Sequence, residues 1–333
     1  MNAAFSEDVL ALRDGAAAFL DQKNNIERLR RDGDAPTSLW LELAAVGLLG
    51  VTAAETLGGL GQRVCDALPI CEEFGYSNLP EPAGETVCII IPLLSRTLAA
   101  GDDRIARLVK GTHRIVTAYE GNQTILAADG SDEILRISPE LVALYKTTSV
   151  SLQPLNSVDP WRKLNRVNAW SAPEQILAQG EDAHALYTFC YDMGATETAA
   201  ELCGLAKRMI ELATTYASKR EQFGQAIGRF QAVKHLLANA LTKLTFARPV
   251  VHRAGALMMA DNADRSLVAA HAKIAASDAA VLAGETAIQV FGGMGYTYEA
   301  ELHYFMKRAW ALAGVWGSRE DHLKTIEQSI LAA

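Results

Sequence analysis

The stretch Gln289-Val-Phe-Gly-Gly-Met-Gly-Tyr296 decides how the chain is organised. Its first half ends a long apolar helix, and its second half is a glycine turn that cannot continue that helix. Gly292, Gly293 and Gly295 lack a Cβ atom, so the backbone there can take positive φ values and approach a ligand closely. Gln289 places an amide one helical turn before the glycines. Taken alone, the pattern also fits an ordinary helix C-cap.

A second stretch, Arg220-Glu-Gln-Phe-Gly-Gln225, stands at the end of another long helix, and Gly228-Arg-Phe-Gln231 follows it and opens the next helix. Arg220 can act as a charge-assisted donor to a diphosphate, although a solvated arginine also suits a helix C-terminus. Together the two stretches resemble the C-terminal domain of the acyl-CoA dehydrogenase family. In that family they hold the pyrophosphate and adenosine part of FAD seated in the neighbouring subunit of a dimer. The resemblance implies FAD as cofactor, with these contact residues: Arg220, Gln222, Phe223, Gln231, Gln289, Gly292 and Gly293.

The composition describes an ordinary soluble protein. The 333 residues suffice for two or three domains, and half of them are hydrophobic while 21% are charged. A net charge of −8 argues against a nucleic-acid surface. Neither a signal peptide nor a run of 18 apolar residues is visible, so we expect no membrane segment. The five cysteines show no metal-ligand spacing, so we expect no metal and reduced thiols in a cytoplasmic protein.

Residues 1–111 are predicted to form a helical domain. Ser6-Glu-Asp-Val9 combines a capping hydroxyl with an acidic first turn, and a second helix is expected from Pro36 to Gly47. The glycine-rich loop Gly50–Gly61 and the helix end Cys71-Glu-Glu-Phe-Gly75 follow. This order resembles the N-terminal domain of acyl-CoA dehydrogenases, although a generic helical domain with glycine-rich turns is an alternative.

Residues 112–192 lose the helical periodicity. Short β-branched runs at Arg114–Thr117, Gln123–Leu126 and Glu133–Ile137 are separated by turn residues and predict antiparallel strands. The region is clearly shorter than the middle β domain of the family.

Residues 193–333 are predicted to form four main helices. Pro249 is expected to kink the second of them. In the third, a seven-residue apolar repeat with alanine and glycine between predicts a closely packed, buried helix; its members are Leu267, Ile274, Val281 and Ile288. The last begins at Ser318-Arg-Glu-Asp321, a capping-box pattern.

The resemblance also shows which parts of the family's site this chain lacks. Where the family has a Thr-Glu-Pro loop beside the flavin ring, Val116-Thr-Ala-Tyr-Glu-Gly-Asn122 has no proline. Gly130-Ser-Asp132 has the family's Gly-Ser-Asp letters at a different offset, so we interpret it as an ordinary turn. The family's Trp-Ile-Thr strand is absent from the shortened β region. The pocket for the isoalloxazine ring is therefore expected to be lost.

The catalytic base of the family is also missing. The reaction needs a carboxylate held in a water-poor pocket against the weakly acidic α C–H bond of the thioester. At the usual position, in the segment Val315-Trp-Gly-Ser318, Trp316 replaces the glutamate. The alternative position of the base corresponds to Met193–Ala195, which has no acid. Glu197 and Glu201 lie one and two turns further along and are the fallback candidates.

These observations predict an α+β, acyl-CoA dehydrogenase-like fold with a shortened β domain. They predict one subunit of a heteromeric, α2β2 acyl-CoA dehydrogenase, whose full-length homologous partner supplies the flavin pocket and the catalytic glutamate. The resemblance is closest to short bacterial subunits that act on steroid side-chain CoA thioesters. Two alternatives stay open: a homomeric enzyme with a relocated base, and a flavin-free scaffold subunit.

Overall fold

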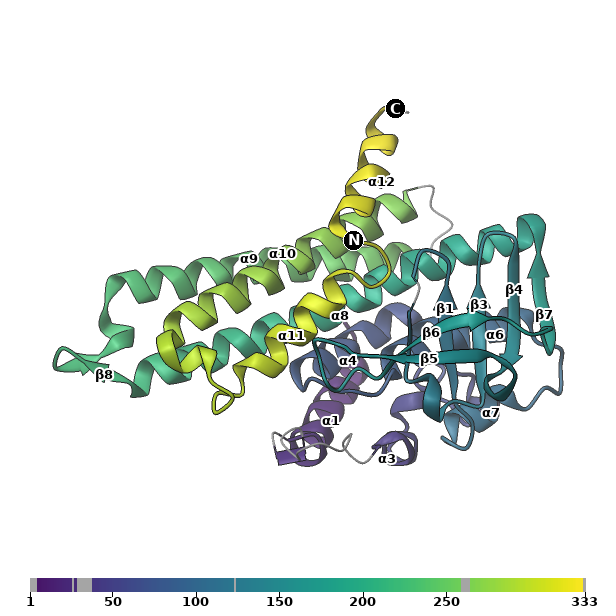
Figure 1. The fold of residues 1–333 in the computed structure, drawn as a ribbon, viewed down its shortest axis with the longest axis horizontal. Helices are drawn as coiled ribbons and strands as arrows, with labels where there is room; N and C mark the ends of the chain where they lie inside the picture. The colour runs from purple at the N-terminus through teal and green to yellow at the C-terminus, as the bar shows by residue number, and fades with distance from the viewer. Residues whose placement is uncertain (1–4, 26, 29–37, 123, 259–263, 332–333) are drawn as a thin grey trace.

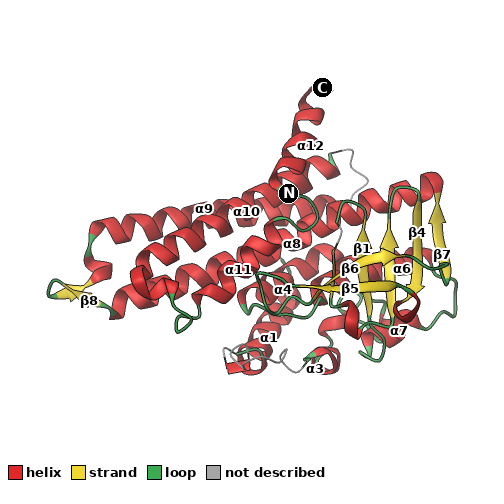
Figure 2. Ribbon diagram, viewed as in Figure 1, coloured by secondary structure: helices red, strands yellow, loops and turns green. Residues whose placement is uncertain are grey.

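The computed structural model describes residues 5–25, 27–28, 38–122, 124–258 and 264–331. Helices from both ends of the chain flank a small β region, and a bundle of long helices extends away from it (Figure 1). Strands are confined to that β region and to one short hairpin at the far end of the bundle (Figure 2). The predicted α+β class is confirmed.

The first N-terminal helix begins where the sequence predicts, whereas the second begins at Trp40, because Ser38 and Leu39 are not helical. Ser6 caps α1 (Glu7–Lys23) by accepting a hydrogen bond from the Val9 amide at 3.3 Å. Helix α3 (Trp40–Ala45) is followed by Gly47 at φ +81°, whereas Pro36 lies outside the described residues. The remaining helices of this part are α4 (Val64–Tyr76), α5 (Ala83–Glu85), the π-helical turn Thr86–Ile90, α6 (Ile91–Thr97) and α7 (Arg104–Val109).

The β region consists of two sheets. The first has the order β1-β3-β4-β7 and the second β2-β6-β5. Their bounds are β1 Ile115–Tyr119, β2 Thr124–Leu126, β3 Glu133–Ile137, β4 Leu141–Lys146, β5 Ser151–Leu155, β6 Leu164–Ala169 and β7 Gln175–Gln179. The expectation of antiparallel strands is wrong for β1 and β3, which pair in parallel with Ile115 opposite Glu133. Strand β2 lies between them in sequence but belongs to the other sheet, which permits the parallel pairing.

The C-terminal bundle is built on α8 (Gly180–Lys219), which directly follows β7, upstream of the expected boundary at residue 192. Helix α9 (Gln231–Met258) continues through Pro249. The capping box of α12 (Arg319–Leu331) is present, since Ser318 and Asp321 exchange hydrogen bonds between side chain and backbone. The other elements are the hairpin β8 (Glu221–Gln222) and β9 (Gln225–Ala226), α10 (Arg265–Phe291) and α11 (Leu302–Ala313).

Helix α10 is the buried bundle helix that the sequence predicts, but alanines form most of its buried face. Ala272, Ala276, Ala279 and Ala283 are buried, whereas Leu267, Ile274, Val281 and Ile288 are only half-buried. Small side chains let the neighbouring helices approach closely, so the larger ones lie at the edge of the contact. Among the described residues, only Arg265–Tyr296 has the length and hydropathy of a membrane span, and 61% of its apolar window is buried inside the fold.

Helices α4 and α8 cross so closely that only glycine fits at the crossing. A Cβ atom on Gly75 would lie 1.9 Å from the Glu201 carbonyl oxygen, and one on Gly204 would lie 1.9 Å from that of Glu72. The helix end Cys71–Gly75 therefore docks the N-terminal helices onto the middle of α8. This contact holds the side chains of Glu197 and Glu201 in the interior.

Candidate functional site

The first predicted binding stretch forms the end of α8 and the hairpin after it. The Arg220 amide still donates to the Tyr216 carbonyl at 2.8 Å, and the chain then turns back at Phe223 and Gly224. Both turn residues have positive φ, at +52° and +75°. Phe223 is 93% exposed, and Arg220 and Gln222 are exposed as well. A positive φ is unfavourable for a residue with a large side chain, and an apolar ring is unfavourable in solvent. The exposed ring of Phe223 therefore indicates a contact surface.

The second stretch lies at the same end of the bundle. Helix α10 ends at Phe291, whose ring stacks on Tyr216 with centroids 4.3 Å apart, so the two stretches are neighbours. Gly292 has φ +58°, and a Cβ atom added to Gly292 or Gly293 would meet nothing within 4 Å. The glycines therefore leave open space beside the backbone. Gln289 and Gln231, the first residue of α9, are exposed.

This end of the bundle fits the pyrophosphate and adenosine part of a dinucleotide. The Arg220 guanidinium makes no ion pair within the described part of the chain, so it is available for a phosphate oxygen. The open glycine turn allows backbone approach, and Phe223 offers a ring face. The predicted contact residues thus lie at the same end of the bundle, and we call them the clamp: Arg220, Gln222, Phe223, Gln231, Gln289, Gly292 and Gly293.

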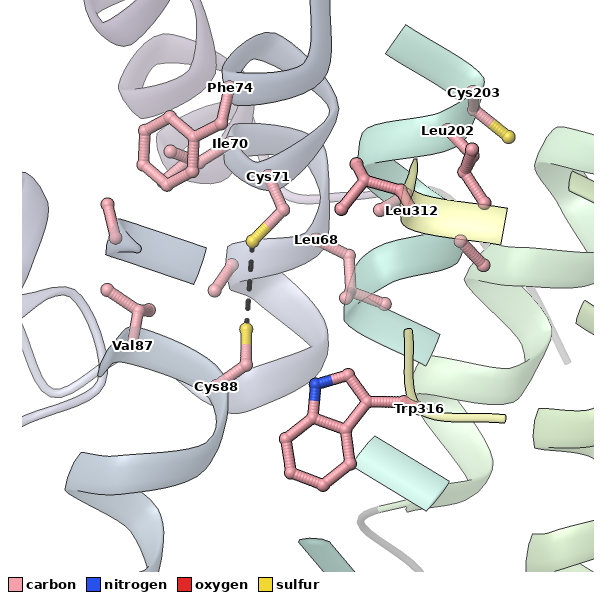
Figure 3. Close-up of a cluster of buried hydrophobic side chains, with 14 of the residues drawn as sticks. Leu68, Ile70, Cys71, Phe74, Val87, Cys88, Leu202, Cys203, Leu312 and Trp316 are labelled. Atoms are coloured by element: carbon pink, nitrogen blue, oxygen red, sulfur yellow. Dashed lines mark hydrogen bonds between the residues drawn. The ribbon is translucent and has the colours of Figure 1, made fainter. Parts of the chain in front are cut away.

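Trp316, in contrast, is completely buried. Its indole stacks on Tyr119 with ring centroids 3.8 Å apart and an interplanar angle of 13°. A Cβ atom on Gly194 of α8 would lie 2.2 Å from Trp316 Cδ2, so glycine is required there. Figure 3 shows the indole in the same buried cluster as Cys88 and Leu312. The two positions at which we expect the base, residues 194 and 316, therefore face each other. Residue 194 is a glycine, and the indole of Trp316 fills the space beside it.

The loop that carries Trp316 is held from three sides. Lys273 Nζ on α10 donates to the carbonyl oxygens of Leu312 at 2.7 Å and Val315 at 2.8 Å. His322 Nε2 lies 2.9 Å from the Trp316 carbonyl, and the Trp316 amide donates to the Tyr119 hydroxyl. Burial lowers the pKa of His322 to about 4, so at neutral pH the neutral ring donates from Nε2. Such anchoring makes Trp316 a fixed part of the fold.

The fallback acids are also enclosed. Glu197 is buried and Glu201 half-buried, and burial raises the pKa of both. A raised pKa suits a general base, but the cavity beside them has a volume of only about 30 Å³. Ligand pockets for small molecules are roughly ten times larger or more. Within the described structure this space is too small for the reacting part of an acyl thioester.

The remaining sequence expectations can be located as well. Ser131 donates to the Ala128 carbonyl at 2.9 Å and Asp132 accepts from the Arg114 amide at 2.8 Å, so Gly130–Asp132 forms a turn as predicted. The five cysteines are free and buried. The described residues include no cluster of three His, Cys, Asp or Glu side chains placed to hold a metal ion.

Sequence reasoning missed three residues that shape this interior: Tyr119, Gly194 and Lys273. Lys273 left a signal, because it is a lysine in the middle of an alanine-rich helix, and a buried ammonium needs acceptors. Tyr119 left none, because its partner Trp316 is 197 positions away.

Comparison with known proteins gives a consistent picture. The model of the acyl-CoA dehydrogenase N-terminal domain matches residues 6–94, and that of the C-terminal domain matches residues 188–331. The chain is 31% identical to acyl-CoA dehydrogenase IpdE2 of Mycobacterium tuberculosis, over 88% of this chain and 86% of the relative. It is also 31% identical to acyl-CoA dehydrogenase FadE34 of the same organism, over 93% of this chain but only 44% of FadE34.

Solved structures share the fold at lower identity. The Tcur3481-Tcur3483 steroid ACAD G363A variant is similar with a TM-score of 0.86 and 21% identity, over 98% of both chains. The ChsE4-ChsE5 complex of M. tuberculosis is similar with a TM-score of 0.87 and 19% identity, over the full length of both chains.

Proposed function

Because the chain belongs to the acyl-CoA dehydrogenase family, whose cofactor is FAD, we propose that it is the non-catalytic subunit of a heteromeric acyl-CoA dehydrogenase. The observation that carries the proposal is the close contact between Trp316 and Gly194, at the two positions where the sequence resemblance leads us to expect the base. The family oxidises the CH–CH bond next to a thioester carbonyl. In our proposal the partner subunit provides the carboxylate and the acyl pocket.

The chemistry explains why the interior of this chain is unsuited to the reaction. Removing the α proton needs a base whose pKa lies near the working pH and which reaches the substrate within hydrogen-bond distance. An indole N–H only donates hydrogen bonds and cannot accept that proton. The stack of Trp316 on Tyr119 excludes substrate as well as water from the position where a base would act.

The clamp gives the chain a role in the complex. When bound, FAD accepts the hydride from the β carbon, and the protein's task is to bind and orient it. Arg220 would pair with the pyrophosphate, and the open turn at Gly292 and Gly293 would approach the same end of the cofactor. These residues face outward, so the FAD that they hold would be seated in the adjoining subunit.

The comparisons support the choice of partner and substrate class. ChsE4-ChsE5 is a complex, and the name of the Tcur3481-Tcur3483 steroid enzyme joins two components. More than half of FadE34 lies outside its match to this chain, which leaves room for a second segment of similar length. We propose a homologous full-length partner in an α2β2 assembly, acting on a steroid side-chain CoA thioester.

The two other functions have weaker support. A homomeric enzyme would need Glu197 or Glu201 as base, and both lie beside a cavity of only about 30 Å³. A flavin-free scaffold would not explain why Arg220 is exposed and makes no ion pair with the described residues. It would also not explain the open space beside the glycine turn.

Co-expression with the homologous partner tests the proposal. The complex should contain one FAD per heterodimer and oxidise an acyl-CoA, whereas the chain alone should contain none. A homo-oligomer of this chain that carries one FAD per copy and turns over acyl-CoA would contradict the proposal. A complex that retains FAD with unchanged affinity in the Arg220→Ala variant would favour the scaffold.

A further inference from the structure

The small cavity in the interior joins all three parts of the fold. Its lining includes Glu85 at the end of α5, Arg162 from the loop between β5 and β6, Glu197 and Glu201 from α8, and Arg308 from α11. Gly84 makes the arrangement possible, because a Cβ atom there would lie 1.8 Å from Glu197 Oε1. The cavity volume is about 30 Å³.

Polar atoms around this cavity lack partners. Glu197 Oε1, Arg162 Nε and Arg308 Nη2 are buried and accept or donate no hydrogen bond within the described structure. Their side chains are 2%, 7% and 4% exposed, so bulk water does not reach them. An unsatisfied buried polar group destabilises the fold, and proteins usually satisfy such groups with internal water. A water needs roughly 10–15 Å³ and two to four polar partners, so the cavity suits one or two waters.

Glu197 and Glu201 also indicate a bound proton. They lie one helical turn apart, and a Cβ atom added to Gly84 would lie 1.8 Å from Glu197 Oε1 and 3.1 Å from Glu201 Oε1, so both carboxyl groups converge on one point of the cavity. Two ionised carboxylates can only accept hydrogen bonds, so the contact is favourable only when one carboxyl carries a proton. Like charges in such a place cannot both ionise without a large cost.

The surrounding charges agree with one proton on the pair. The titratable groups that face it come from every neighbouring element: Cys71 on α4, Glu85 on α5, Cys88 on the π-helical turn, Arg162, Lys273 on α10 and Arg308. The hydrogen bond with Cys88, together with burial, raises the pKa of Cys71, and burial raises that of Cys88, so both thiols are neutral. Arg308 is in turn paired with the fully buried Asp159. Burial lowers the pKa of Lys273 to about 7, but its three carbonyl acceptors favour the ammonium form, which has a donor proton for each of them.

With one proton on the pair, three negative groups oppose three positive ones. The negative groups are Glu85, Asp159 and the remaining carboxylate of the pair, and the positive groups are Arg162, Lys273 and Arg308. Loss of that proton would leave one uncompensated negative charge in the interior.

We propose that this cavity is a water-bridged proton site, in which Glu197 and Glu201 share one proton and internal water connects them to Arg162 and Arg308. The site holds the N-terminal helices, the β region and the bundle together at one point, and it makes their junction sensitive to alkaline pH. The inference does not depend on the heteromeric function proposed above.

The direction of the pH effect follows from the bound proton. A carboxyl that keeps its proton in the folded state, but has an ordinary pKa of about 4.3 when unfolded, makes the folded state bind more protons. Its contribution to stability is therefore lost as the pH rises above that value and through the folded pKa. A glutamine at residue 197 mimics the protonated carboxyl at every pH, because its amide can donate to Glu201.

The experiment compares the Glu197→Gln variant with the wild-type full chain in its purified state, including any partner that co-purifies. An infrared difference spectrum at neutral pH should show one protonated carboxyl C=O band per chain in the wild type that Glu197→Gln lacks. Between neutral pH and about pH 9, the melting temperature of the wild type should fall relative to that of Glu197→Gln, because only the wild type loses the shared proton. Glu181→Gln, an exposed residue in the first turn of α8, is the matched control and should change neither result.

If Glu197→Gln fails to fold, Glu201→Gln replaces it, since either carboxyl can carry the proton. A wild-type spectrum without the band, or an unchanged pH dependence in the folded variant, would overturn the proposal. A high-resolution crystal structure should place at least one ordered water in contact with Glu197 and Arg162. A cavity without ordered water in that structure would also overturn the proposal.

Discussion

Helix α8 carries two regions of opposite character. At its C-terminus, Arg220 and the hairpin after it point charged and aromatic side chains into solvent, next to a glycine turn with open space beside it. In its middle, Gly194 is covered by the Trp316 indole, and Glu197 and Glu201 face a cavity that holds no more than a few waters. One region is exposed and, in our proposal, meets a partner subunit, whereas the other is filled by the chain itself.

The difference supports the proposal that this chain retains the cofactor-binding half of a site shared with another subunit. An exposed apolar ring at positive φ costs stability in an isolated subunit and is useful only in contact with another molecule. A fully buried aromatic stack stabilises the subunit and excludes ligands. The family's reaction needs both a cofactor clamp and an acyl pocket, and here only the clamp faces outward.

The largest expected effect separates the partner's base from the acids of this chain. Replacing the partner's candidate glutamate by glutamine should lower turnover roughly 10²–10⁴-fold, because the proton-transfer contribution is lost. Glu197→Gln and Glu201→Gln in this chain should stay within a few-fold of wild type. Dye-coupled oxidation of a steroid CoA thioester by each reconstituted complex provides the measurement. A collapse of turnover in either variant, with FAD and fold retained, would place the base in this chain.

Trp316→Ala should produce the next effect, on stability. Removing a fully buried tryptophan costs about 3–5 kcal/mol, from lost contacts and the cavity left between Tyr119 and Gly194. Trp310→Ala is the matched control, because Trp310 is 49% exposed on α11 and should cost about 0.5 kcal/mol or less. Denaturant unfolding measures both. Equal losses in the two variants would mean that the indole of Trp316 does not fill the interior as described.

The two regions also differ in how far the sequence predicts them. The clamp residues stand in short stretches at helix ends, so the sequence alone proposes them. The structure places these stretches at the same end of the bundle, and their contact with FAD stays a prediction. Trp316 could be recognised as a replacement of the base, but its role as a filler depends on Tyr119 and Gly194, which are remote in sequence. The spacing of apolar residues and the capping residues predict where helices begin and end. Which side chains meet across the interior can be seen only in the folded structure.

The same limit explains the error in the β region. Composition and turns predict strands β1, β2 and β3 at the observed places, since β-branched runs and turn residues act locally. The parallel pairing of β1 with β3 arises because β2 pairs with β6 in the second sheet. No local sequence pattern predicts which strands pair with each other. Helix α10 shows the same limit of local patterns. Packing against the neighbouring helices buries its alanines and leaves the larger apolar residues half-buried: Leu267, Ile274, Val281 and Ile288.

The clamp is tested by Arg220→Ala in the complex. Hydrogen bonds to charged groups contribute roughly 1.5–3 kcal/mol, so FAD should bind about tenfold or more weakly. Arg253→Ala, an exposed arginine elsewhere on α9, should leave the affinity unchanged and controls for lost surface charge. Fluorescence titration of the FAD-free complex measures both dissociation constants. Equal FAD affinities of wild type and Arg220→Ala would mean that Arg220 does not contact the cofactor and is an ordinary surface residue.

The smallest effect concerns the loop that holds Trp316 in place. Burial lowers the pKa of His322 from an ordinary 6.5 to about 4, so between these values the unfolded chain binds more protons than the folded one. Stability should therefore fall as the pH drops from about 6.5 to 4, with a slope of up to about 1.4 kcal/mol per pH unit from this residue. His252, whose pKa burial also lowers to about 4, contributes to the same slope.

His322→Gln keeps a donor for the Trp316 carbonyl but cannot titrate, so it should remove only the share of the slope that belongs to His322. His271→Gln, at an exposed position of α10, should leave the slope at its wild-type value. Thermal unfolding at a series of pH values measures each variant. If the slope of His322→Gln equals that of wild type, the ring of His322 takes up its proton as easily in the fold as outside it, and the loop at Trp316 is more open to water than its buried contacts indicate.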